Sequence, residues 1–229
     1  INKIYYIKIM SDQQYLYISL ISCIGYFLID FFNPEYIDKE NDIYINITSL
    51  TNALITGIPS LLIMSNDNII YYFSTTNPLD IEMKYKIVPF ILYGYSIYEL
   101  QYFHFNCFIL KTKQYDMLIH AMMMFLFLSL AIYYNSTHLT TIASIQEISS
   151  IFLNYRCNDT TRLLFFFTYS YFRMYMFPKL VIEYLYINPY NTDVYFLLAL
   201  GTCISISLNT FWYKKILSMF LKGLKKKLE

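Results

Sequence analysis

The sequence predicts an all-α fold: a polytopic transmembrane bundle of six to seven helices over residues 1–229, with no β-sheet and no soluble domain. Of the 229 residues, 57% are hydrophobic and 14% are charged, whereas soluble domains carry about 25% charged residues. Apolar stretches near the length of about 20 residues that a spanning helix needs recur along the chain. No linker or change in composition marks a second domain, so we expect a single transmembrane domain.

Six stretches are long and apolar enough to span a bilayer, and they cover residues 14–32, 45–64, 87–110, 115–134, 163–186 and 194–220. A seventh, residues 139–153, is shorter and more polar, and it contains Gln146 and Glu147. The segments between the stretches are short and rich in Asn, Asp, Thr and Pro, as expected of loops. The last stretch is longer than a span requires, and we expect its end to emerge as an amphipathic helix.

The distribution of Lys and Arg predicts the orientation, because basic residues collect on the cytosolic side of a membrane. With seven spans and an outer N-terminus, eleven basic residues fall on the cytosolic side and four on the other. We therefore expect a cytosolic C-terminus. If residues 139–153 do not cross, the parity of the spans changes and this orientation fails.

Charge and cysteine usage exclude several function classes. The formal net charge is +1, so there is no basic footprint for a nucleic acid and no nucleic-acid partner is expected. The cysteines are far apart, without metal-ligand spacing, so we expect buried small hydrophobic side chains and no metal site. They are Cys23, Cys107, Cys157 and Cys203.

Several ionisable side chains fall within or near the expected spans, where facing lipid would cost each of them several kcal/mol, on the order of 3 or more. We expect them to face the bundle interior, or for some to reach water at the interface. On a helix, Glu147, Ser150 and Asn154 share one face, which indicates a polar interior. The ionisable residues are Asp30, Glu99, His104, His120, Glu147, Arg173 and Glu183.

Six motifs follow one another along the spans. Ser49-x-x-Asn52-Ala53 and "GYSIYEL" (94–100) come first, then "YDMLIHAMMM" (115–124) and "EISSIFLNYR" (147–156). "FFFTYSYFRMYMFP" (165–178) and "LNTFWYKKI" (208–216) complete the series. In this order they resemble the TLC-domain family, which includes ceramide synthases, over about residues 46–220. Rare residues of this chain occupy motif positions: His120, Arg156, Arg173 and Trp212.

The resemblance to ceramide synthases implies a multi-pass enzyme of the endoplasmic reticulum in sphingolipid metabolism. It would make His120 a general base or acyl carrier, oriented by Glu99 or Glu147. However, the paired histidines of those enzymes are reduced here to His120-Ala121, and Asn52 stands where members typically have His. These departures place the chain nearer the less characterised TLC proteins and favour binding over catalysis.

Two functions stay open, and both take membrane lipids or long-chain acyl groups as partners. One is a protein of membrane-lipid homeostasis that encloses an acyl chain in an intramembrane cavity. The other is an N-acyltransferase of ceramide synthase type, with acyl-CoA as co-substrate and no other cofactor. A buried network that only fixes helix packing is the alternative to a site. The expected polar lining of the cavity is Asn52, Asn154, Arg156 and Arg173.

The lysines near the end of the chain bear on its location. Lys226 and Lys227 in the final "KKLE" resemble a dilysine retrieval signal, which with the family resemblance predicts the endoplasmic reticulum. A basic cluster on anionic lipid explains the same residues equally well. Of the sequons at Asn46, Asn135 and Asn158, only Asn135 faces the lumen in the expected topology. Asn135 is close to the membrane, so we expect little or no glycan.

Overall fold

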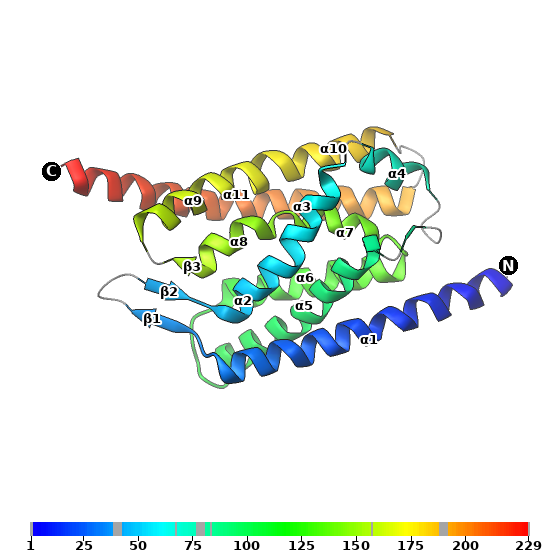
Figure 1. The fold of residues 1–229 in the computed structure, drawn as a ribbon, viewed down its shortest axis with the longest axis horizontal. Helices are drawn as coiled ribbons and strands as arrows, with labels where there is room; N and C mark the ends of the chain where they lie inside the picture. The colour runs from blue at the N-terminus through cyan, green and yellow to red at the C-terminus, as the bar shows by residue number, and fades with distance from the viewer. Residues whose placement is uncertain are drawn as a thin grey trace. The chain divides into compact units, whose positions relative to one another are not determined.

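A computed structural model describes residues 2–38, 43–66, 68–76, 81–82, 84–156, 158–187 and 192–228. The chain divides into two compact units. Unit 1 comprises Ile1–Pro34 and Thr75–Ser144, and unit 2 comprises Glu35–Ser74 and Ile145–Glu229. Helices make up most of the described chain (Figure 1), which confirms the all-α prediction. The expectation of one domain over residues 1–229 stays a prediction.

Unit 1 contains α1 (Asn2–Phe32), α5 (Lys84–Phe108), α6 (Tyr115–Tyr133) and α7 (Thr137–Ser144). Helix α5 packs on the other three. Helices α1 and α5 approach closely at Gly94, where an added Cβ would meet the carbonyl oxygen of Ser19 and the backbone nitrogen of Cys23. Glycine permits this approach because it has no side chain. The core beside it is rich in tyrosine and contains Cys23, Tyr26, Leu92, Tyr95, Tyr98 and Leu128.

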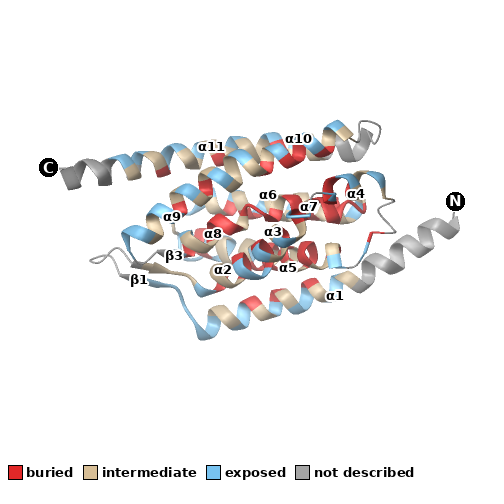
Figure 2. Ribbon diagram, turned by 45° about the horizontal axis from the view of Figure 1, so that its top comes forward, coloured by how far each residue is buried: buried red, intermediate tan, exposed pale blue. Residues whose placement is uncertain are grey.

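Unit 2 contains two helical runs and the elements between them. The first run is α2 (Ile47–Asn52), the π-helical segment η1 (Ala53–Gly57) and α3 (Ile58–Met64), followed by α4 (Ile69–Thr75) at the unit boundary. The second is α9 (Asp159–Tyr169), the π-helical segment η2 (Ser170–Met176) and α10 (Phe177–Ile187). Helix α8 (Glu147–Asn154) packs on α2, η1 and α9 and carries many buried positions (Figure 2). Helix α11 (Thr192–Leu228) completes the unit.

Three helical stretches of the described chain are long and apolar enough to cross a membrane: Tyr15–Phe32, Ile47–Met64 and Tyr115–Tyr133. They coincide with the predicted spans 14–32, 45–64 and 115–134. The other predicted spans are also helical: 87–110 falls largely in α5, 163–186 in the run from α9 to α10, and 194–220 in α11.

The prediction that the fold has no β-sheet was wrong. Strands β1 (Tyr36–Asp38), β2 (Ile43–Ile45) and β3 (Tyr155–Arg156) form an antiparallel sheet with β2 in the centre. The "IYI" of β2 is apolar, but it consists of β-branched and aromatic residues that favour a strand. Helix α2 begins only at Ile47, because the Asn46 side chain accepts the Ser49 N–H at 2.8 Å and caps the helix.

The predicted seventh stretch, 139–153, is not one continuous helix. Helix α7 ends at Ser144 and α8 begins at Glu147, so Ile145 and Gln146 interrupt it, and the two helices belong to different units. Both interrupting residues are buried. The Gln146 side chain accepts a hydrogen bond from Asn209 of α11 at 2.7 Å. The break in the helix therefore coincides with a polar contact between Gln146 and α11.

Candidate functional site

The candidate site lies in unit 2, where α8 packs against η2. Segment η2 interrupts an otherwise α-helical run, and Arg173 lies within it. π-Helical turns are rare and often occur at functional positions. Arg173 is fourteen residues from each end of the run Asp159 to Ile187, so it lies about 21 Å from either end along the helix. The arginine is therefore central in a helix of membrane-spanning length.

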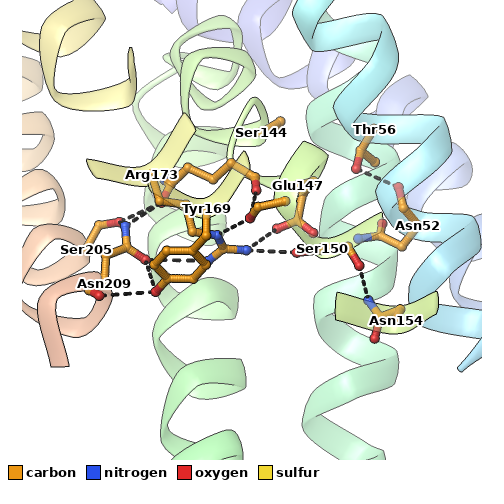
Figure 3. A network of polar contacts seen from close by, with 12 residues as sticks. Asn52, Thr56, Ser144, Glu147, Ser150, Asn154, Tyr169, Arg173, Ser205 and Asn209 are labelled. Carbon is orange, nitrogen blue, oxygen red and sulfur yellow. Dashed lines mark hydrogen bonds and ion pairs between the residues drawn. The ribbon is translucent and has the colours of Figure 1, made fainter. Parts of the chain in front are cut away.

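Two serine hydroxyls of α8 hold the guanidinium of Arg173 (Figure 3). Its Nε donates to Ser149 Oγ at 2.7 Å, and its Nη2 donates to Ser150 Oγ, which the figure labels, at 2.8 Å. Nη2 also lies 4.0 Å from Oε1 of Glu147, which is an ion pair without a direct hydrogen bond. The adjacent serines thus fix the guanidinium beside a carboxylate of the same helix.

Helix α11 contributes Asn209, which connects this pair to the break before α8. Asn209 Nδ2 donates to Gln146 Oε1 at 2.7 Å, and Arg173 Nη1 lies 3.5 Å from Asn209 Oδ1. The Tyr169 hydroxyl donates to the Asn209 carbonyl at 3.2 Å, and the Tyr169 ring centroid lies 5.2 Å from Arg173 Cζ. Ser205, one turn before Asn209, donates to Gln146 Oε1 at 3.4 Å. Three helical segments therefore meet at one polar network (Figure 3).

The charges of the network balance, and they are largely shielded. The side chains of Arg173 and Glu147 are 15% and 17% exposed, and each alone would be costly in a bilayer. A guanidinium carries five N–H donors, and the two short bonds use two of them, while Nη1 is held only at 3.5 Å. The site can therefore still donate to an acceptor at Arg173 and accept from a donor at Glu147.

The first helical run of unit 2 presses on the start of α8. A Cβ at Gly57 would meet the backbone nitrogen of Ile148 at 3.0 Å and the backbone carbon of Glu147 at 3.1 Å. Gly57 ends η1, and Thr56 Oγ1 donates to the carbonyl of Asn52 at 2.7 Å one turn earlier. Because glycine has no side chain, the backbone of η1 can lie directly against the residue that carries the carboxylate.

Asn154 ends α8 and connects it to Asn46, the residue between β2 and α2. Its Nδ2 donates to the Ser150 carbonyl at 2.9 Å, and its own carbonyl accepts the Asn46 N–H at 2.9 Å. Asn46 is the residue that caps α2. Asn154 therefore fixes the end of α8 and reaches Arg173 only through Ser150.

The predicted site residues divide between the two units. Asn52, Glu147, Asn154 and Arg173 belong to unit 2. Of these, Glu147 and Arg173 lie 4.0 Å apart. Arg156 belongs to β3, whose backbone pairs with β2, and its side chain lies outside the described part of the chain.

The two remaining predicted residues belong to unit 1. His120 lies on α6 and Glu99 on α5, and both are half-buried. The grouping of His120 and Glu99 with Glu147, as a base and the carboxylates that orient it, stays a prediction.

Ser149, Tyr169 and Asn209 lie within the quoted motifs, but neither they nor Ser205 were named as site residues. A signal for two of them exists, because Ser205 and Asn209 are four residues apart in an apolar run and so share one helix face. Ser149 carries no such signal, since a serine in a helix usually donates to a carbonyl of its own helix. Ser149 does so here, to Gln146 at 2.8 Å, while it accepts from Arg173.

Comparison with known proteins agrees with these features. A family model described as TLC domain matches residues 42–218, which include the whole polar network. Neither a curated protein nor a solved structure matches the chain. The family match and the apolar helices indicate an integral, multi-pass, lipid-related membrane protein. The match extends over well more than half of the residues, and the chain belongs to the TLC domain family.

Proposed function

We propose that this protein binds a membrane lipid and acts in membrane-lipid homeostasis, in the endoplasmic reticulum and with its C-terminus in the cytosol. The polar end of the lipid meets Arg173 and Glu147, and its acyl chain occupies a cavity within the bundle. Membership of the TLC domain family supports a lipid-related role. The binding itself rests on the polar network of unit 2.

The observation that carries the proposal is the pair of shielded opposite charges midway along a spanning-length run. Arg173 and Glu147 are 15% and 17% exposed, with 4.0 Å between their charged atoms. Ionisable groups at membrane depth are costly and usually mark the path or site of a ligand. The 4.0 Å separation supports a pair that keeps capacity for a ligand.

The chemistry of the pair favours a particular kind of polar group. A lone cation would select an anion, but Arg173 and Glu147 together are neutral. An uncharged or zwitterionic group that both accepts and donates hydrogen bonds complements them better, because neither protein charge is then left without a partner. Hydroxyl, amide and amine-containing lipid headgroups meet this condition.

Within unit 1, the residues that follow His120 on α6 form an apolar stretch suited to an acyl chain. Met122 is exposed, and Met123 and Met124 are half-buried. Methionine side chains adapt to irregular apolar shapes, which suits them to a flexible chain. In the proposal Asn52 and Asn154, both of unit 2, line the polar part of the cavity.

Lipid mass spectrometry of the purified full chain tests the proposal. We expect one lipid class to copurify well above its share of the membrane, and Arg173→Lys and Glu147→Gln each to lower its occupancy about tenfold, which is about 1.4 kcal/mol of binding free energy. A lysine cannot bond both serines in one plane. Arg162→Lys is the matched control, since Arg162 pairs with Asp159 at 3.1 Å on the outer part of α9. Equal occupancy in all variants, or no enriched lipid in the unmodified protein, would refute the proposal.

Acyl-CoA-dependent N-acyltransfer is the second proposal, and it rests on His120 in the family motif with carboxylates on other helices. An assay with acyl-CoA and a long-chain amine tests it. N-acylated product that disappears in His120→Ala, with the fold retained, supports an enzyme. Absence of product with the unmodified protein leaves lipid binding as the function.

A further inference from the structure

Helix α11 is longer than a bilayer requires. Its 37 residues extend about 55 Å at the helical rise, whereas a hydrocarbon core is about 30 Å thick. More than a third of the helix must therefore lie in the headgroup region or in water. The match to the TLC domain ends at residue 218, so much of this extension lies outside the family domain.

Trp212 marks where α11 leaves the hydrocarbon region. The ammonium of Lys215 lies 4.5 Å from the Trp212 ring and 4.4 Å from the Phe211 ring. Tryptophan is enriched at the membrane–water interface, where an indole ring and a cation both find suitable surroundings. Residues 213–228 then extend about 24 Å beyond this level.

One side of the extension of α11 packs on α9. Ile216 is buried in a cluster with Phe165 and Tyr169, and the rings of Phe166 and Phe220 stack with 4.6 Å between centroids. Lys214 and Lys215, on the other side, are exposed. The apolar side of the extension is thus covered by α9.

Five lysines share one side of α11 by helical periodicity, and the two of them nearest Trp212, Lys214 and Lys215, are exposed. At about 100° per residue, positions 214, 215, 222, 225 and 226 fall within a sector about 120° wide, and all five are lysine. No Asp or Glu occurs between residues 194 and 228, so this part of α11 carries a net positive charge. A basic stripe on a helix beside a membrane span favours anionic lipid headgroups.

We propose that this lysine face, formed by Lys214, Lys215, Lys222, Lys225 and Lys226, binds the headgroups of anionic phospholipids at the membrane surface. The partner is the phosphate and carboxylate groups of lipids in the leaflet next to Trp212. This binding is separate from the lipid at Arg173. It concentrates anionic lipid around α11 whether or not the Arg173 site is occupied.

The single tryptophan of the chain provides a local probe for the test. The full chain is reconstituted in phosphatidylcholine vesicles that contain a minor fraction of phosphatidylserine, with bromine on the acyl chains of one lipid or the other. We expect brominated phosphatidylserine to quench Trp212 as strongly as if its share around the tryptophan were about fivefold or more above its share in the vesicle. A single lysine near an anionic surface already gives an enrichment of about that size. High salt should remove the preference, because surface charges are screened.

Replacing the five lysines of the lysine face with glutamine should abolish the preference at low salt. The matched control replaces Lys111 and Lys113, two exposed residues in the loop before α6, with glutamine and should keep the preference. Equal quenching by both brominated lipids in the unmodified protein would overturn the proposal. So would a preference that survives high salt, a result that does not depend on how any variant folds.

Discussion

At the scale of single residues, the site separates hydrogen bonding from charge pairing. Arg173 makes its short hydrogen bonds to Ser149 and Ser150, while Glu147 lies 4.0 Å from Nη2. The hydroxyls fix the orientation of the guanidinium, and the carboxylate acts through space, where a partly shielded environment strengthens Coulomb interactions relative to water. The two charged residues should therefore contribute differently to stability.

The first prediction concerns that difference. Arg173→Met removes both short hydrogen bonds and leaves Glu147 without its cation, so we expect a loss of about 3 kcal/mol in the free energy of unfolding. Glu147→Gln keeps both bonds and should cost about 1 kcal/mol. Thermal unfolding of the detergent-solubilised variants measures both. A larger loss for Glu147→Gln would mean that the carboxylate, and not the serines, holds the arginine.

The second prediction concerns glycine. Gly57→Ala places a Cβ 3.0 Å from the Ile148 nitrogen and 3.1 Å from the Glu147 carbon, and both are backbone atoms that move only with the helix. We expect destabilisation of about 1–3 kcal/mol and a fall in lipid occupancy, because α8 carries the site. Gly25→Ala is the control, since nothing lies within 4 Å of its added Cβ. It should leave the melting temperature unchanged or raise it, and equal effects at both glycines would contradict the packing.

At the scale of elements, asparagines of two sequons begin helices. Asn46 caps α2, and Asn158 forms a capping box with Thr161 at the start of α9. The sequon pattern and the cap pattern overlap because both place Asn shortly before a hydroxyl residue. The expectation of little or no glycan at these positions stays a prediction.

The third prediction tests the capping box of α9. Asn158→Ala removes the acceptor for the Thr161 N–H, which lies 2.9 Å away, and should cost about 1 kcal/mol. Asn158→Asp keeps an acceptor at the helix N-terminus and should retain the stability, while it also destroys the sequon. Unfolding midpoints of the two variants give the comparison. Equal losses would show that the cap is not what stabilises the start of α9.

The elements also show how far the sequence could be interpreted. Apolar length located α1 and α6, and Asn46 was visible as a sequon but not as the cap that separates β2 from α2. The length of an apolar stretch could not separate β2 from α2, because the "IYI" of β2 is as apolar as the first residues of a membrane helix. The π-helical segments η1 and η2 escaped prediction because close packing at Gly57 and hydrogen bonds from Arg173 to α8 depend on tertiary contacts. The residue types of the site were visible, and Asn209 lay within a quoted motif, but its contacts with Gln146 and Arg173 were not predicted.

At the scale of the whole molecule, the question is whether the segment from α7 to α8 crosses the membrane. The segment from Thr137 to Asn154 has 18 residues, close to the length of about 20 residues that a crossing needs, and the turn at Ile145 and Gln146 divides it between the two units. Irregular backbone is tolerated at membrane depth only where protein covers it. Ile145 is 0% and Gln146 8% exposed, which satisfies that condition. We therefore expect the segment to count as a crossing.

The fourth prediction follows from the number of membrane crossings, which this segment makes seven. With seven crossings and an outer N-terminus, the segment between α10 and α11 lies in the lumen and the lysine-rich end of α11 in the cytosol, where basic residues are favoured. A glycosylation acceptor tag inserted after Ile187 should be modified, and the same tag after Leu228 should not. A tag between α5 and α6, beside Lys111 and Lys113, serves as the cytosolic reference and should stay unmodified. If the first two results are reversed while the reference holds, the segment from α7 to α8 does not cross. The lysine face of α11 would then lie on the lumenal leaflet, and its lipid partners would have to be sought there.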